Sequence, residues 1–208
     1  NIFFLWYTKF TMYKKNFNIK KKNLFKSLGQ IEKELPNIKN IIDLIVEHVK
    51  NNGKILLCGN GGSAADAQHL AAEFLVRLRP KVNRKPIAAL SLAMDTSTIT
   101  ACGNDYSFND IFARNLEAVS NNKDILIVIS TSGNSKNILN VLKKAKKLNI
   151  KSIGFLGNKG GKAKGLCDNF IIVKSNNTAT IQETHIFIGH LVFEQVEKRL
   201  LKSNYVWH

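Results

Sequence analysis

Cysteines are few in this sequence, and long apolar runs are lacking. The chain of 208 residues has three cysteines, Cys58, Cys102 and Cys167. Their odd number and apolar surroundings predict reduced core residues of a cytoplasmic protein rather than a disulfide framework. No apolar run approaches the roughly 20 residues that a membrane-spanning helix needs, so no membrane partner is expected. Linkers, repeats and low-complexity segments are also missing, which favours a single domain.

Acidic residues are scarce relative to basic ones. The 15 Asp and Glu residues against 31 Lys and Arg give a formal charge of +16. Such a charge suits nucleic acid, acidic partners or phosphorylated substrates. Lysine and asparagine are nevertheless spread along the whole chain, and no Arg-rich or aromatic-interleaved motif is present. We therefore interpret most of the charge as solvated surface lysine, and we predict no nucleic-acid partner.

Residues 1–12 do not resemble the rest of the chain, because they are aromatic and lack helix caps. A secretory signal peptide would have basic residues before its apolar core and a small-residue cleavage site after it, and neither is present. We expect Met12 to be the natural start and residues 1–12 to be an upstream extension. Residues 13–208 then form one domain whose core spans about 36–200. Finding Asn1 intact in the native protein would contradict this.

A strand, a glycine turn and a helix follow one another at residues 55–75. The apolar run Ile55–Cys58 is long enough for a buried strand, and Gly59, Gly61 and Gly62 allow a tight turn. Ser63 is a good helix N-cap, and the next dozen residues are strong helix formers. This geometry presents free backbone N–H groups and a positive helix end to an anion, typically phosphate.

His69 and Glu73 lie one turn apart on that helix and share a face. They are either a solvated surface pair or part of a site. The residues between and after them are mostly apolar, so the helix is largely packed and its polar side chains need partners or a function. A phosphate cradle that leads to an imidazole and a carboxylate is typical of a small-molecule site.

Strands and helices alternate along the chain. We expect strands at 55–58, 87–92, 124–130, 151–156 and 170–173. We expect helices at about 16–28, 36–50, 63–75, 96–102, 108–119, 136–148 and 181–201, with a turn at 103–106, a helical turn at 160–166 and a polar loop at 175–180. The run Asp124–Ser130 is continuously apolar, as in a parallel strand covered on both faces. The alternation predicts an α/β fold with a doubly wound parallel sheet, whose ligands bind at the carboxyl ends of the strands.

A second polar loop, Ser130–Ser135, follows the run 124–130 at the same edge of the sheet. It is similar to a phosphate-binding loop without a lysine, since hydroxyls and the N–H groups of the next helix can ligate phosphate oxygens. Simple helix capping is the alternative, because Ser and Thr cap helices routinely. The glycine loop at the same edge favours phosphate binding.

The last helix has two polar residues of interest, Gln182 and His190. His190 has apolar neighbours, so a buried structural histidine is one interpretation. An ideal helix separates the two residues by about 12 Å along its axis and by roughly 80° around it. A site that contains both therefore needs long side-chain reach or a departure from ideal helix near Gln182.

Five motifs in series make the chain resemble the phosphoheptose isomerases of the sugar-isomerase (SIS) domain superfamily. They are Cys58–Ser63, Asp66–Glu73, Gly103–Tyr106, Ile129–Ser135 and Ile181–Ile186 with His190. The resemblance covers about residues 30–200. It implies a flavodoxin-like αβα sandwich with a five-stranded parallel sheet and N-terminal helices. It also implies a cytoplasmic homotetramer with sites near subunit interfaces. The implied reaction converts sedoheptulose 7-phosphate to D-glycero-D-manno-heptose 7-phosphate, for lipopolysaccharide or another surface polysaccharide.

The resemblance also implies roles for individual residues. Glu73 would be the general base and His190 the partner acid/base of an enediol mechanism. One zinc ion per subunit would polarise the substrate carbonyl or hold the shape of the site, with the ligands His69, Glu73, Gln182 and His190. The implied substrate-binding residues are Asn60, Gly61, Gly62, Ser63, Glu73, Asn104, Asp105, Ser130, Thr131, Ser132, Ser135 and Gln182, of which the four hydroxyl residues at 130–135 would hold the phosphate.

One position departs from the family, and two other functions stay open. Thr180 stands where many relatives have arginine, which predicts the loss of an interface or substrate contact but not of the chemistry. The main alternative is a non-enzymatic SIS tetramer that binds the replication initiator DnaA, but such relatives lack the groups that match Glu73 and His190. A sugar-phosphate-sensing domain usually lies beside a DNA-binding module, and none is evident. The length and stereochemistry of the sugar stay undetermined.

Overall fold

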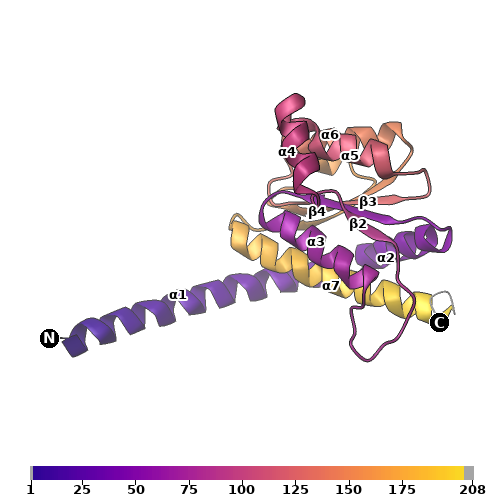
Figure 1. Cartoon of the computed structure of the whole chain (residues 1–208). Coiled ribbons are helices and arrows are strands. Elements are labelled where there is room, and N and C mark those ends of the chain that lie inside the picture. The colour runs from indigo at the N-terminus through magenta and orange to yellow at the C-terminus, as the bar shows by residue number, and fades with distance from the viewer. Residues whose placement is uncertain (1, 204–208) are drawn as a thin grey trace.

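A parallel sheet lies between two layers of helices in the computed structural model, which describes residues 2–203 (Figure 1). The strand order is β2-β1-β3-β4-β5. The strands are β1 (Ile55–Gly59), β2 (Ala89–Ser91), β3 (Ile125–Ser130), β4 (Lys151–Gly157) and β5 (Asn169–Val173). All four pairings are parallel. The expected flavodoxin-like five-stranded sheet is confirmed, although β2 is shorter than the predicted strand 87–92.

Helices cover both faces of the sheet (Figure 1). One layer contains α2 (Leu35–Lys50), α3 (Gly62–Leu75) and α7 (Thr178–Lys202), joined by the end of α1 (Ile2–Ile31). The other contains α4 (Thr96–Asp105), α5 (Ile111–Val119) and α6 (Lys136–Lys147). Short 3₁₀ turns occupy Glu32–Glu34, Phe108–Asp110 and Lys162–Gly165.

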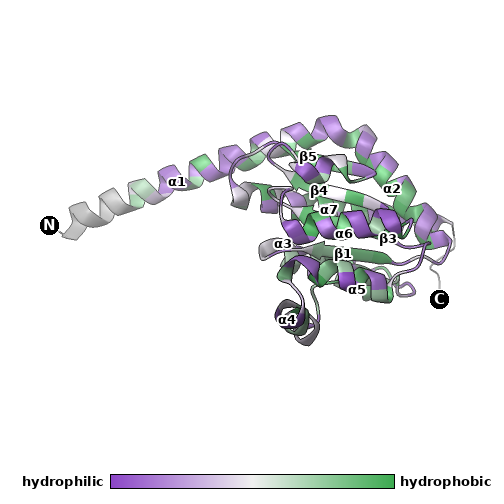
Figure 2. Cartoon of the chain, turned by 90° about the horizontal axis from the view of Figure 1, so that it is seen from above, coloured by the Kyte–Doolittle hydropathy of each residue, from purple (hydrophilic) through white to green (hydrophobic). Residues whose placement is uncertain are grey.

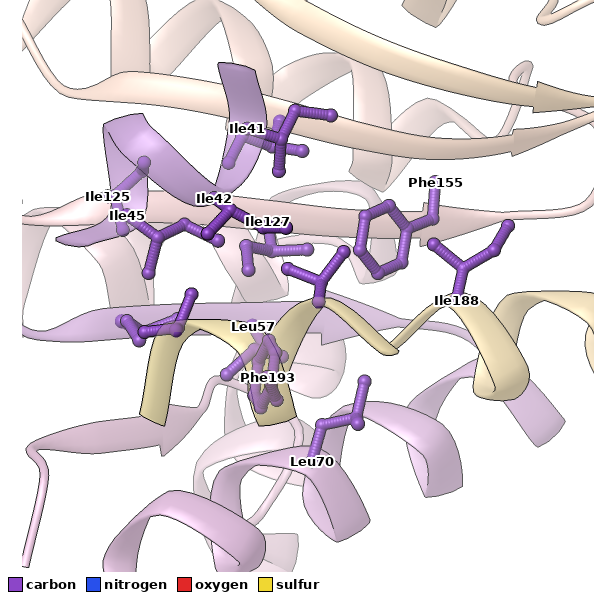
Figure 3. Packing of buried hydrophobic residues seen from close by; sticks show 14 of the residues in the cluster. Ile41, Ile42, Ile45, Leu57, Leu70, Ile125, Ile127, Phe155, Ile188 and Phe193 are labelled. Atoms are coloured by element: carbon purple, nitrogen blue, oxygen red, sulfur yellow. The ribbon is translucent and has the colours of Figure 1, made fainter. Parts of the chain in front are cut away.

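The strands are apolar throughout because each face of the sheet meets a helix layer. Leu57 on β1 packs with residues of α2, α3 and α7, whereas its neighbour Leu56 packs with residues of α5 and α6. Figure 3 shows the first of these clusters, in which Leu70 of α3 and Phe193 of α7 approach Leu57. This packing fixes α3 and α7 against the sheet and against each other.

Helix α1 extends away from the sheet, as two perpendicular views agree (Figures 1 and 2). It includes the predicted helix 16–28 and passes through Met12 without a break. Whether residues 1–12 are an extension stays a prediction. Between residues 2 and 203, no helix combines the length and hydropathy needed to cross a bilayer.

Three local predictions were wrong. Ser63 is not an N-cap: Gly61 takes that position with φ 56°, which favours glycine, and Ser63 is buried inside α3. The predicted turn at 103–106 is mostly helix, since α4 runs to Asp105. Glycine costs only about 1 kcal/mol in a helix and does not end one by itself. Helix α7 begins at Thr178 rather than at 181, because Asn177 Oδ1 caps it by accepting from the Thr180 N–H.

Strand β1 lies between β2 and β3, so the chain adds β2 on one side of β1 and the later strands on the other side. In open α/β sheets, the crevice at such a switch point is where ligands bind. The loop after β1 and the loop after β3 meet at this place, with paired residues Gly59 and Ile129 at the ends of their strands. The fold therefore brings together the two polar loops found in the sequence.

Candidate active site

Two histidines and a glutamate meet between α3 and α7. His69 Nε2 lies 2.8 Å from His190 Nε2 and 3.3 Å from Glu73 Oε1. The two rings are edge-on, with an interplanar angle of 82°. His69 and Glu73 come from successive turns of α3, as their spacing predicts, and His190 comes from α7. We call this group the His69–Glu73–His190 cluster.

The donor atoms of the cluster suit a metal ion. One atom from each residue lies within 4.8 Å of the others. A single nitrogen, His69 Nε2, faces both the His190 nitrogen and the Glu73 carboxylate, so three atoms with lone pairs converge. A cation between the three groups would accept a lone pair from each. Two imidazoles and a carboxylate form a common ligand set for zinc and related divalent metals.

The cluster is open to solvent on one side. The side chain of His69 is 48% exposed, whereas that of Glu73 is 18% exposed. The carboxylate is thus largely shielded while the imidazole beside it faces outward.

Asp66 is a neighbour of the cluster to which the sequence analysis gave no role. It lies about one turn before His69 on α3. One of its carboxylate oxygens is buried with no hydrogen-bond partner among the described residues. Burial raises the pKa of Asp66 above its ordinary value, and nearby His69 opposes this shift. Its position in the motif Asp66–Glu73, one turn from the predicted ligand His69, could have indicated that it lies near the site.

The two polar loops are joined by a pair of amides. Asn60, directly after β1, exchanges two side-chain hydrogen bonds with Asn137 in the first turn of α6, at 2.9 and 2.8 Å. Asn137 is 2% exposed and also accepts from the Ile138 N–H. Sequence reasoning missed Asn137 because the residue lies past the serine-rich loop and belongs to no motif.

The loop Ser130–Ser135 is shaped by its own hydroxyls. Ser130 Oγ accepts from the Gly133 N–H at 3.0 Å, and Ser132 Oγ accepts from the Asn134 N–H at 3.1 Å. Ser135 is the N-cap of α6 but makes no side-chain capping hydrogen bond. Simple helix capping therefore does not explain the Ser135 hydroxyl, which leaves its predicted role in phosphate binding open.

Gln182 lies against the beginning of α3. A Cβ atom placed on Gly62 would come within 2.6 Å of Gln182 Nε2. Helix α7 is continuous from Thr178 to Lys202, so the separation of about 12 Å between Gln182 and His190 along its axis persists. Of the two alternatives, a departure from ideal helix is absent in this described part of α7, which leaves side-chain reach. Gln182 thus lies at the start of α3, while His190 lies in the cluster.

Asn104 and Asp105 occupy a different part of the fold. Both are exposed at the end of α4, where Asn104 Nδ2 donates to Asp105 Oδ1 at 2.7 Å. Helix α4 belongs to the layer opposite α3 and α7 (Figure 1). Within one chain, the structure does not bring these two residues to the cluster.

Comparisons with known proteins show the family of this chain. The SIS domain family matches residues 21–157. A phosphoheptose isomerase from Helicobacter pylori strain P12 is 46% identical over 190 residues, which cover 91% of this chain and 96% of that protein. One from Clostridium acetobutylicum is 49% identical over 166 residues, or 80% and 84% of the two chains.

This chain belongs to the phosphoheptose isomerase family. The solved structure of phosphoheptose isomerase GmhA from Neisseria gonorrhoeae superposes with a TM-score of 0.83 at 34% identity, over 89% of this chain and 98% of that one. A phosphoheptose isomerase from Francisella tularensis gives the same TM-score and identity, over 91% and 98%. The resemblance read from the five motifs is confirmed, and no comparison favours the DnaA-binding alternative.

Proposed function

We propose that the chain interconverts sedoheptulose 7-phosphate and D-glycero-D-manno-heptose 7-phosphate as a phosphoheptose isomerase. The observation that supports this most is the cluster itself, in which a shielded carboxylate lies beside two imidazoles. The phosphoheptose isomerase relatives, at 46% and 49% identity, support the substrate. The product would supply heptose for lipopolysaccharide or another surface polysaccharide.

Glu73 and His190 would perform the proton transfers. Glu73 removes a proton from C1 of the ketose to give an enediol and returns a proton to C2 to give the aldose. His190 moves a proton from the oxygen on C1 to the oxygen on C2, so the reaction neither consumes nor releases protons overall. General acid–base groups of this kind contribute about 10²- to 10⁴-fold each.

The loops would hold the two ends of the substrate. The phosphate is assigned to the hydroxyls of Ser130, Thr131, Ser132 and Ser135, together with the N–H groups at the start of α6. The sugar hydroxyls are assigned to Asn60, Gly61, Gly62, Ser63, Asn104, Asp105 and Gln182. Asn104 and Asp105 are distant from the cluster in one chain, so their role depends on the homotetramer that we also propose.

Zinc would occupy the His69–Glu73–His190 cluster, with Gln182 as a fourth ligand. The convergent donor atoms support the first three ligands. Gln182 needs the reach of its long side chain, since it lies about 12 Å along α7 from His190. A bound zinc ion would polarise the substrate carbonyl.

The test is to incubate the purified protein with sedoheptulose 7-phosphate, with and without zinc, and to follow the aldose by NMR. Formation of the heptose phosphate supports the proposal. An inactive protein that is tetrameric and loaded with zinc would contradict it. Binding to purified DnaA would be measured in the same preparation, and we expect none.

A further inference from the structure

A buried arginine contacts the backbone of Glu73. Arg84 lies in the loop between α3 and β2, and its side chain is fully buried. Its Nη2 donates to the Glu73 carbonyl at 2.8 Å and its Nη1 donates to the Phe74 carbonyl at 2.9 Å. These carbonyls belong to the last turn of α3, whose carbonyls have no partner within the helix. Arg84 thus completes the end of the helix that presents Glu73.

The same arginine is fixed to α7 by a buried carboxylate. Arg84 Nε donates to Glu197 Oε1 at 2.6 Å, and the side chain of Glu197 is also fully buried. Arg79, from the same loop, donates to the other oxygen, Glu197 Oε2, at 2.7 Å. Glu197 follows His190 by about two turns, so both lie near one face of α7.

Apolar contacts hold α3 and α7 in the same register. The Phe74 ring stacks on the Phe193 ring with centroids 4.1 Å apart. Leu70 packs so closely on Gly189 that a Cβ there would lie 2.6 Å from Leu70 Cδ1. The Arg84–Glu197 pair therefore holds the end of the α3–α7 interface that follows the cluster along both helices.

We propose that Arg84 and Glu197 are positioning residues, which set the distance of Glu73 on α3 from His190 on α7. This inference rests on the proposed role of Glu73. Arg84 holds the backbone of Glu73, Glu197 holds Arg84, and α7 carries both Glu197 and His190. Buried, charge-assisted hydrogen bonds thus connect the backbone of Glu73 to the helix that carries His190.

The cost of burying these charges supports a specific role. Replacing a buried ion pair by apolar residues of similar volume is often neutral or stabilising, so such a pair is weak evidence for stability alone. Displacing a reacting group by about 1 Å, in contrast, can cost roughly 100-fold in rate. The pair is suited to fixing geometry.

The test compares Glu197→Gln, Arg84→Lys and the apolar double variant Arg84→Met/Glu197→Leu with the wild type. We expect kcat to fall about 10- to 100-fold, with KM changed less than about two-fold. Zinc affinity, measured by competition with a chelating dye, should fall by a similar factor, as for residues that orient metal ligands. The double variant should remain folded, so its lower kcat and zinc affinity cannot be attributed to unfolding.

Asp124→Asn is the matched control. Asp124 is fully buried and pairs with Lys54 at 2.6 Å, but at the opposite end of the sheet, where β1 and β3 begin. It should lower thermal stability and leave kcat and zinc affinity near wild type. A folded double variant with wild-type kcat and zinc affinity would overturn the positioning role. If Glu73→Gln, assayed alongside, retains activity, the proposed function of Glu73 fails instead.

Discussion

Asn60 and Asn137 bridge the switch point of the sheet through a reciprocal pair of amide hydrogen bonds. Asn60 directly follows β1, and Asn137 belongs to α6, the helix that follows β3. Each amide satisfies one donor and one acceptor of the other. The pair therefore holds the sugar-binding loop and the phosphate-binding loop of the proposed site at a fixed separation.

Replacing Asn137 by alanine should loosen the substrate site. The change leaves the half-buried Asn60 amide without its partner. An unpaired polar group costs about 1 to 3 kcal/mol when it is fully buried, so we expect a cost near the lower end of this range. We expect KM for sedoheptulose 7-phosphate to rise about ten-fold, equivalent to about 1.4 kcal/mol of binding energy, with a smaller effect on kcat. Steady-state kinetics and thermal denaturation measure the two effects.

Asn140→Ala is the control for this change. Asn140 is on the same helix and donates to the Asn109 carbonyl and to Asp110 Oδ1, away from Asn60. It should lower stability without raising KM. Equal KM values for the two variants would show that the amide bridge does not position the substrate loops.

His185 predicts a loss of stability in acid. It is 1% exposed, neither ring nitrogen makes a hydrogen bond of normal geometry, and burial lowers its pKa from 6.5 to about 4. The unfolded chain therefore binds a proton more readily than the folded chain. Stability is fully present above the unfolded pKa of 6.5 and is lost as the pH falls toward 4.

Chemical denaturation at pH 7.5 and pH 5 measures this contribution. We expect the free energy of unfolding to fall by about 2 kcal/mol more in the wild type than in His185→Leu, which has no titrating group. His48→Gln, a change at a half-buried histidine on α2 whose Nδ1 lies 2.8 Å from the Lys123 carbonyl oxygen, should leave the wild-type difference intact. An identical pH response of the wild type and His185→Leu would refute the role of His185.

Gly189→Ala should force α3 away from α7. The new Cβ would lie 2.6 Å from Leu70 Cδ1 in a fully packed interface. Such overpacking typically costs about 1 to 3 kcal/mol. Adding Leu70→Ala to Gly189→Ala makes room for the methyl group, so the two changes together should destabilise less than the sum of each alone. If the losses of stability of the two single variants add up to that of the double variant, the new methyl group does not clash with Leu70.

Metal binding by the cluster has its own test. His69→Gln removes one of three convergent donors while keeping a polar side chain of similar length. We expect zinc affinity to fall at least about 100-fold, since even residues that only orient metal ligands are worth 10- to 100-fold. Cobalt(II) absorption reports the same change without any assay of activity. Wild-type affinity in this variant would exclude His69 as a ligand.

The sequence was sufficient to predict the order of strands and helices and the edge at which the polar loops meet. Continuous apolar runs such as 125–130 and the spacing of His69 and Glu73 are local signals, and both were read correctly. Local signals failed at Gly103, where glycine was taken as a helix end although the helix continues through it. They failed again at Ser63, where the backbone of Gly61 rather than a side chain begins the helix.

Contacts between distant residues were beyond the sequence. The pair Asn60 and Asn137 and the pair Arg84 and Glu197 join segments far apart in the chain, and no short motif contains either pair. An arginine in a loop and a glutamate near the end of a helix look like solvated charges, because most such residues are. Only the packing of α3 on α7 makes Arg84 and Glu197 buried partners.

Transfer of a carbon-bound proton by Glu73 is the central claim, and deuterium labelling tests it most directly. Sedoheptulose 7-phosphate is incubated in D₂O with the zinc-loaded wild type, Glu73→Gln, His190→Gln and the surface control Glu117→Gln, and NMR follows label at C1 of the ketose and C2 of the aldose. We expect label with the wild type and the control. Labelling by Glu73→Gln and His190→Gln should be at least about 100-fold slower. Labelling by Glu73→Gln at the wild-type rate would contradict the account, because another group would then move the proton.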